Sequence, residues 1–140
     1  MEESRGDGRN RSEIPELDAR IQGLDEDLRA DALSEAGTQS SPLLARALLY
    51  TVESYAAALF LRLRAELFES RLGMPRSDAE VFSILQAHGT FDLVEARKLR
   101  QFCEARSLSS RDLRKIDLAG IREMVADRAW IRDLFSRLAK

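Results

Sequence analysis

Apolar residues recur every three or four positions through most of the chain, the spacing that puts side chains on one face of an α-helix. The first such pattern predicts an amphipathic helix from about Ser12 to Leu33, which Gly23 weakens by up to about 1 kcal/mol. Residues 35–41 are polar and predict a loop. Residues 1–11 have no apolar side chain after Met1, so we expect a disordered tail followed by a single domain over residues 12–140.

The longest apolar pattern begins after Ser41 and Pro42. The Ser41 hydroxyl can cap a helix whose first turn holds Pro42, where no amide donor is required. A left-handed stop is expected at Gly73. This helix would be about 46 Å long, more than a small bundle requires, so we expect it to bend or to project into a partner. Its inward face is predicted to hold Leu44, Leu48, Val52, Tyr55, Leu59, Leu63 and Leu67.

Three further helices are predicted in the second half. Ser77 and Glu80 have the spacing of a capping box and open a short helix that ends at Gly89. Thr90 is predicted to cap the next helix and Asp117 the last. Five helices with short connections predict an all-α fold, an antiparallel bundle of four to five helices. The inward residues are expected to include Val81, Ile84, Leu85, His88, Val94, Leu99, Phe102, Cys103, Leu118, Ile121, Val125, Ile131, Leu134, Phe135 and Leu138.

Composition limits the chemistry that this chain can carry. One cysteine and one histidine cannot supply the three or four nitrogen and sulfur ligands of a zinc site, and no intrachain disulfide can form. The apolar runs fall far short of the ~20 residues of a membrane helix, and the N-terminus is too polar for a secretory signal. We therefore expect a soluble, cytoplasmic protein without metal, cofactor or membrane contact.

Charge is distributed unevenly along the chain, although the net charge is only −2. Residues 1–41 hold eleven acidic residues against five arginines. Residues 97–115 hold seven basic residues against two acidic ones. The basic patch favours binding to a polyanion, binding to an acidic surface of a partner, or pairing with the acidic N-terminal helix of the same chain. The alternative is a solvent-exposed helix face with no binding role.

The order of these elements resembles a HEPN domain over residues 43–138, and it is similar to the small bacterial HepT-like proteins, also described as nucleotidyltransferase substrate-binding proteins. The family motif is Arg, usually Asn, three variable residues and His, commonly followed two places later by Tyr. Arg106 matches the first position. Ser107 stands in place of Asn, Arg111 in place of His and Leu113 in place of Tyr.

The resemblance implies a homodimer, a minimal nucleotidyltransferase as partner and a role in toxin–antitoxin systems or defence. In active members the Arg holds a phosphate and the His moves a proton while RNA is cleaved without metal. A guanidinium at position 111 stays charged and cannot act as a base, so we expect a catalytically degenerate protein that binds RNA or a nucleotide phosphate. The binding candidates are Arg106, Ser107, Arg111, Arg97, Arg100 and Arg114.

Two other functions remain open from the sequence. An active metal-independent HEPN ribonuclease would need another base, and the sole histidine, His88, would have to reach the Arg106 cleft. A helical protein–protein adaptor would dock a partner helix on the long second helix. Cys103 is expected to be a buried apolar residue, whereas Tyr50 and Trp130 fit either the core or an interface.

Overall fold

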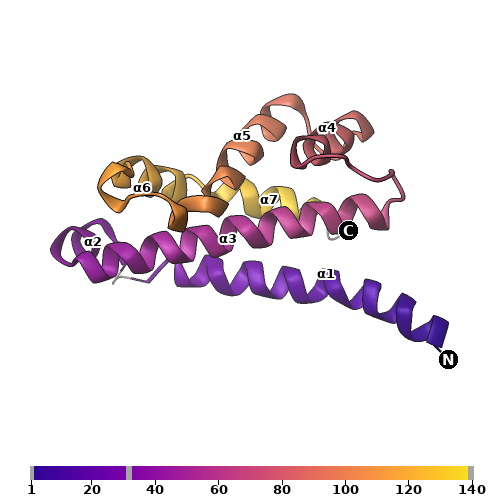
Figure 1. Cartoon of the computed structure of the whole chain (residues 1–140), viewed down its shortest axis with the longest axis horizontal. Helices are drawn as coiled ribbons and strands as arrows, with labels where there is room; N and C mark the ends of the chain where they lie inside the picture. Colours follow the sequence, from indigo (N-terminus) through magenta and orange to yellow (C-terminus); the bar gives the residue numbers. More distant parts are fainter. Residues whose placement is uncertain (1, 31–32, 139–140) are drawn as a thin grey trace.

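The computed structural model describes the backbone of residues 2–30 and 33–138 and the side chains of residues 13–30, 33–112 and 114–138. Within these ranges the protein is all-α, with no strand, as predicted (Figure 1). The elements are α1 (Glu2–Asp27), α2 (Glu35–Ser40), α3 (Pro42–Glu69), α4 (Asp78–His88), α5 (Leu93–Cys103), the 3₁₀ helices η2 (Glu104–Ser110) and η3 (Leu113–Lys115), α6 (Leu118–Ala126) and α7 (Ala129–Leu138).

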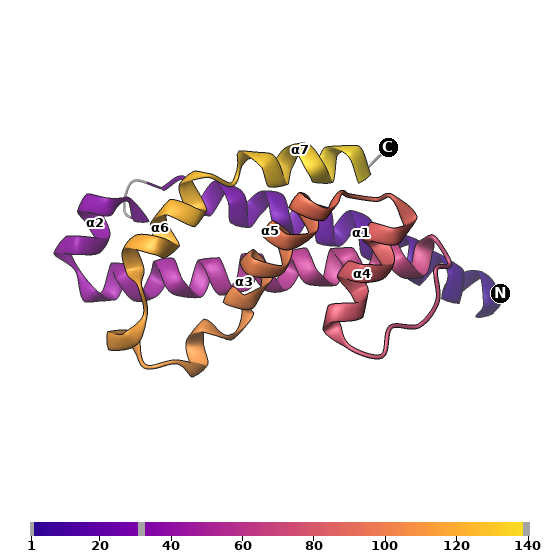
Figure 2. The same ribbon diagram turned by 90° about the horizontal axis from the view of Figure 1, so that it is seen from above.

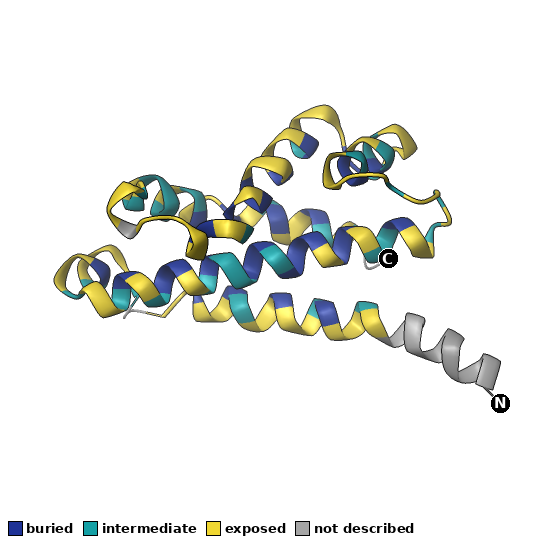
Figure 3. Ribbon diagram, viewed as in Figure 1, coloured by how far each residue is buried: buried dark blue, intermediate teal, exposed yellow. Residues whose placement is uncertain are grey.

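Helix α3 runs through the middle of the molecule and carries most of the core. It lies antiparallel to α1, while η2 packs on another of its sides and α4 and α5 cover its C-terminal half (Figures 1 and 2). Buried residues therefore recur along its whole length (Figure 3). The expectation that no segment is long and apolar enough to cross a membrane needs a correction, because α3 is so by length and composition, with half of its most apolar window buried in the bundle.

Several predicted helix ends are confirmed. The Leu44 amide donates to the Ser41 hydroxyl at 3.3 Å, and Pro42 occupies the first turn of α3. The Gly120 amide donates to the Asp117 carboxylate at 3.0 Å, which caps α6. Gly89 ends α4 with a φ of +88°, the left-handed conformation that glycine adopts without strain.

The polar segment after residue 34 is not a loop. It forms α2, because the Ser34 hydroxyl accepts a hydrogen bond from the Gly37 amide at 3.2 Å and Glu35 lies in the first turn. The Thr38 side chain is buried, and its hydroxyl donates to the Ser34 carbonyl at 2.9 Å. A run without large apolar residues thus forms a helix through its caps.

Helix α1 differs from its prediction at both ends, since it begins at Glu2, within the expected disordered tail, and ends at Asp27 instead of near Leu33. Helix α1 packs on α3, and Leu17 and Ile21 are among its buried side chains. Extending an existing helix adds one hydrogen bond for each residue fixed, without a new nucleus. The domain boundary at residue 12 stays a prediction.

The end of α3 differs from the prediction. Arg71, not Gly73, takes the first left-handed position, with a φ of +55°. The Leu72 amide donates to the Leu67 carbonyl and the Arg71 amide to the Phe68 carbonyl, both at 3.1 Å, which is the Schellman pattern. Gly73 follows with a φ of +112°.

The caps of α4 and α5 need corrections. The Ser77 hydroxyl accepts from the Glu80 amide, but the Glu80 carboxylate accepts from the Arg76 amide, so only half of the predicted box forms. Helix α5 is capped by Asp92 instead of Thr90. Asp92 and Glu95 form a complete capping box at 2.8 and 3.0 Å, because a carboxylate at this place accepts an amide hydrogen bond and complements the helix dipole.

Two residues predicted to face inward are exposed instead. His88 lies at the end of α4 beside Gly89, and Val94 lies in the first turn of α5, where the chain enters from solvent. The predicted last helix is also divided into α6 and α7 around Arg128, whose side chain is buried against α1.

Candidate functional site

Arg106 is held against the bundle by three different contacts. Its guanidinium carbon lies 3.9 Å from the centre of the Phe60 ring of α3. Its Nε donates to the Cys103 carbonyl at 2.9 Å, and its Nη2 donates to Asp78 Oδ2 at 3.3 Å. The side chain keeps 28% of its surface exposed. Arg106 therefore joins α3, α4 and η2, and much of its hydrogen-bonding capacity is used inside the protein.

Arg111 lies in a different environment. It lines a cavity of about 230 Å³ between α3 and the η2–η3 segment, together with Arg46 and Tyr50. Arg106 is not among the residues that line this cavity. The two arginines of the motif thus do not converge on one cavity within the described chain. The other lining residues are Leu49, Leu108, Ser109 and Ile116.

Ser107 bends the backbone of η2, and its hydroxyl is bonded within the chain instead of facing a ligand. Its φ of −113° and ψ of 20° depart from helical values inside η2. Its hydroxyl donates to the Glu104 carbonyl at 3.3 Å. This bend separates the environments of Arg106 and Arg111.

The other basic candidates do not form one cleft with Arg111. Arg97 is exposed on α5, and Arg100 lies 5.6 Å from the centre of the Phe82 ring and donates to the Ala79 carbonyl at 3.5 Å. Arg114 donates to Asp112 from its side chain and its backbone. These hydrogen bonds, the side-chain ones first, lower the pKa of the Asp112 carboxyl.

Cys103 is buried, as predicted, and its environment does not favour the reactive thiolate. Burial raises the pKa of its thiol to about 12, although the neighbouring Arg106 opposes this shift. A thiol with this pKa carries almost no thiolate near pH 7, and the thiolate is the reactive form. The residue belongs to the core around Tyr55 and Phe102, whose rings meet edge to face at 5.6 Å.

His88 cannot supply the base that position 111 lacks. It is exposed at one end of α4, whereas Asp78, which binds Arg106, starts the other end. An eleven-residue helix separates these ends by about 15 Å along its axis. Among the residues with described side chains, no group of three His, Cys, Asp or Glu is arranged to hold a metal ion.

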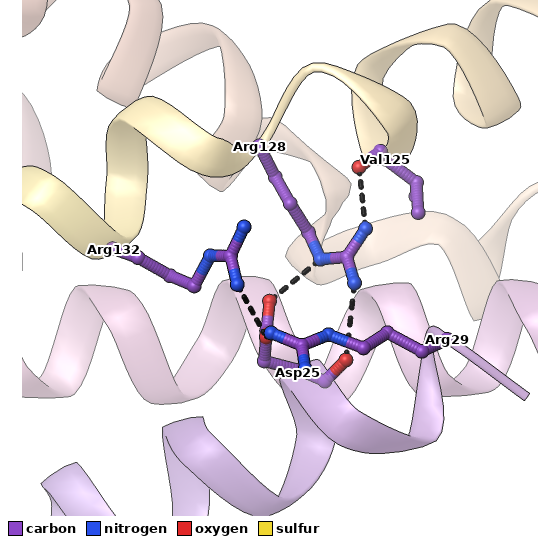
Figure 4. Close-up of polar contacts among 5 residues, drawn as sticks. All are labelled: Asp25, Arg29, Val125, Arg128 and Arg132. Atoms are coloured by element: carbon purple, nitrogen blue, oxygen red, sulfur yellow. Dashed lines mark hydrogen bonds and ion pairs between the residues drawn. The ribbon is translucent and has the colours of Figure 1, made fainter.

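A buried charge cluster that the sequence did not predict connects α1 with the segment from α6 to α7 (Figure 4). Asp25 of α1 is 4% exposed and accepts from Arg128 Nε at 2.6 Å and from Arg29 Nη2 at 3.0 Å. Arg128 also donates to the Val125 and Asp25 carbonyls at 2.7 and 3.1 Å, and Arg132 lies 4.0 Å from the carboxylate. The four-residue spacing of Asp25 and Arg29 was the only signal of this cluster in the sequence.

A second buried arginine has the same character. Arg62 is 1% exposed in the middle of α3 and pairs with Asp18 of α1 at 2.8 Å and with Glu66 at 2.9 Å. It interrupts an apolar stretch, which is the signal that could have identified it. Both clusters attach α1 to the bundle, and neither borders the Arg46–Arg111 cavity.

Comparison with known proteins gives one informative result. No family model matches the chain, and no curated protein matches its sequence significantly. Among solved structures, it is similar to a chain in a crystal structure of a toxin–antitoxin with AMP-PNP, with a TM-score of 0.62 and 14% identity over 94% of this chain and 92% of that one. Over nearly its full length, this protein therefore has the fold of a component of that toxin–antitoxin structure.

Proposed function

We propose that this protein acts by binding, as the helical, HEPN-like component of a toxin–antitoxin type of pair. The observation that carries this proposal is the fold similarity to a toxin–antitoxin component, which extends over 94% of the chain. The HEPN resemblance of residues 43–138 agrees with it. The proposed partner is a nucleotidyltransferase-type protein, the proposed assembly contains a homodimer of this chain, and the proposed location is the cytoplasm.

The chemistry of the motif supports binding rather than RNA cleavage. The guanidinium of Arg111 stays protonated at every accessible pH and cannot remove a proton. His88, the only imidazole, lies at the far end of α4 from the Arg106–Asp78 pair. General base catalysis contributes about 10²–10⁴-fold, so its loss removes the step that turns a phosphate-binding motif into a nuclease.

The partner is tested by purifying the tagged, full-length chain from its native host. We expect a nucleotidyltransferase-type protein to copurify in a fixed ratio, and light scattering to give at least twice the 15.8 kDa of one chain. A monomer that copurifies with no such protein would overturn the proposal.

The loss of catalysis is tested by rebuilding the family motif. Ser107→Asn combined with Arg111→His should add RNA cleavage or growth toxicity that the native chain lacks. The matched control is Ser107→Asn with Arg111→Gln, which removes the same charge but supplies no imidazole. RNA cleavage by the native chain that Arg111→Ala abolishes would contradict a binding role, and a folded double variant without any gain would contradict the HEPN assignment.

An adaptor without nucleic-acid chemistry is a second candidate, favoured by one observation. Helix α3 exposes Leu43, Tyr50, Leu61 and Phe68, whose spacings of seven and eleven residues place them on one side of the helix. Exposed apolar residues in a row fit a partner helix. A copurified helical protein without nucleotidyltransferase activity would favour this function.

A further inference from the structure

The cavity between α3 and the η2–η3 segment combines two cations, an aromatic ring and an apolar floor. We propose that it is a nucleotide site, in which the base stacks on Tyr50 and the phosphate lies between Arg46 and Arg111. The ligand is a single phosphorylated nucleoside, either free or at the end of a single-stranded RNA. The inference rests on the proposed binding role and adds a ligand class to it, and the site needs no residue of the partner protein.

The two arginines are available to an anion. Neither Arg46 nor Arg111 forms an ion pair with any residue whose side chain the structure describes. No acidic residue lines the cavity, and the carboxylate next to Arg111, that of Asp112, is occupied by Arg114. Two guanidinium groups at one cavity attract phosphate, which each can bind through a pair of parallel hydrogen bonds.

Tyr50 supplies a surface for the base. Its side chain lies one helical turn after Arg46 on α3 and remains 70% exposed, although tyrosine is a large aromatic residue. Aromatic side chains in this situation bind nucleobases by stacking, which tolerates any base because every base has a π-face. The apolar floor of Leu49, Leu108 and Ile116 excludes water beneath the ligand.

A hydrogen bond connects the two walls of the cavity. The Ser109 amide donates to Glu53 Oε2 of α3 at 2.5 Å, which holds η2 on the helix that carries Arg46 and Tyr50. The volume of about 230 Å³ lies below the roughly 300–1,000 Å³ typical of sites for drug-sized ligands. The cavity therefore encloses only part of a nucleotide, and the rest of the ligand would extend into solvent. Glu53 acts as a positioning residue.

The site is tested by calorimetric titration of the full-length protein with AMP at low salt. Adenosine and inorganic phosphate should each bind at least tenfold more weakly than AMP, because each makes only half of the contacts. A 5′-phosphorylated oligoadenylate distinguishes the sources: tighter binding than AMP identifies an RNA end, and equal or weaker binding identifies a free nucleotide.

Substitutions on the surface of the cavity separate a defined site from general attraction of anions. Arg46→Gln and Arg111→Gln should each weaken AMP binding by about tenfold or more, since each removes charged hydrogen bonds. Tyr50→Leu should weaken it about tenfold, whereas Tyr50→Phe, which keeps the ring, should stay within about twofold. The matched control is Arg76→Gln, which changes an exposed arginine outside the cavity and should leave binding unchanged.

Three results would overturn the inference. They are no AMP binding at millimolar concentration, equal losses for Arg76→Gln and Arg111→Gln, and unchanged binding by Tyr50→Leu. Circular dichroism checks each variant, and a shift of the Tyr50 ring resonances on adding AMP to the native protein tests the site without any substitution. Copurification of the partner with the native protein is measured in parallel. If the native protein binds its partner but not AMP, only this inference fails, and if it binds neither, the proposed function fails as well.

Discussion

Arg128 and Arg111 show how one residue type serves opposite purposes in the same small protein. Arg128 is buried between α1 and α6, where its guanidinium meets a carboxylate and two carbonyls. Arg111 is exposed at a cavity and forms no ion pair within the described side chains. A buried charge must be compensated for the chain to fold, whereas an exposed one is left free to meet a ligand. If the proposed nucleotide site is correct, stability and binding depend on different arginines.

The largest expected effect comes from removing one side of the buried cluster. Arg128→Leu should lower the free energy of unfolding by about 3 kcal/mol, because Asp25 keeps its buried charge and loses its shortest ion pair. Urea denaturation measures the loss. The double variant Asp25→Leu/Arg128→Leu should be less destabilised than the single one, and an equal or greater loss would contradict the role of the unpaired charge.

Alkaline pH provides a second test of burial. The unfolded chain loses the Cys103 proton above its ordinary pKa of 9.0, while the folded chain keeps it until about pH 12. The unfolded state then binds fewer protons, so stability should fall between pH 9 and 12, with this thiol contributing a slope that approaches about 1.4 kcal/mol per pH unit. Burial also raises the pKa of Tyr55 above its ordinary 10.0, which adds to the fall at higher pH.

Urea midpoints at pH 8, 9, 10 and 11 check this prediction. Cys103→Ala should be less stable at pH 8, because a cavity replaces the sulfur, but should lose stability less steeply above pH 9. Parallel curves for the variant and the native protein would contradict it. Tyr55→Phe is the companion variant. It also removes a buried hydroxyl that has no hydrogen-bond partner in the described structure.

Replacing Arg106 is expected to cost less stability than replacing Arg128 and more than replacing Arg46 or Arg111. Arg106→Ala should cost about 1–2 kcal/mol, because it removes the contact with Phe60 and the hydrogen bonds to Cys103 and Asp78. Arg106→Lys should restore little of this, since an ammonium lacks the planar face and the fork of donors. Urea denaturation separates the variants, and full recovery by lysine would show that charge alone matters.

The smallest effect on stability is expected at the cavity. Arg46→Ala and Arg111→Ala should each change the free energy of unfolding by less than about 0.5 kcal/mol, since both side chains are exposed and unpaired among the described residues. A loss near that of Arg106→Ala would show that these arginines belong to the fold, and the contrast with Arg128 would disappear.

The fold was predictable because apolar periodicity and caps determine helices locally. The pattern from Leu48 to Leu67 identified the buried face of α3, and Ser41, Gly89 and Asp117 marked helix ends correctly. Helix α2 was missed because its stability comes from capping at Ser34 and from one buried threonine, not from an apolar face.

The candidate site was predictable only in part. Arg111 was identified, but Arg46 and Tyr50 lie some sixty residues earlier in the sequence, and only packing of η2 on α3 brings the three residues together. Arg106 was assigned to phosphate binding from the motif, since no local pattern reveals that Phe60 and Asp78 will occupy its guanidinium. A pair of residues that are far apart in the sequence, such as Asp25 and Arg128, produces no periodic pattern from which it could be predicted.

The Asp25–Arg128 pair also affects the order in which the protein can be completed during synthesis. Its two residues are 103 positions apart, and a ribosome that adds about 5–20 residues per second delivers Arg128 roughly 5–20 s after Asp25. During that time Asp25 has Arg29 as a partner but lacks Arg128, which makes its shortest ion pair in the folded protein. A message that ends before codon 128 would therefore yield a chain whose first helix lacks this buried ion pair.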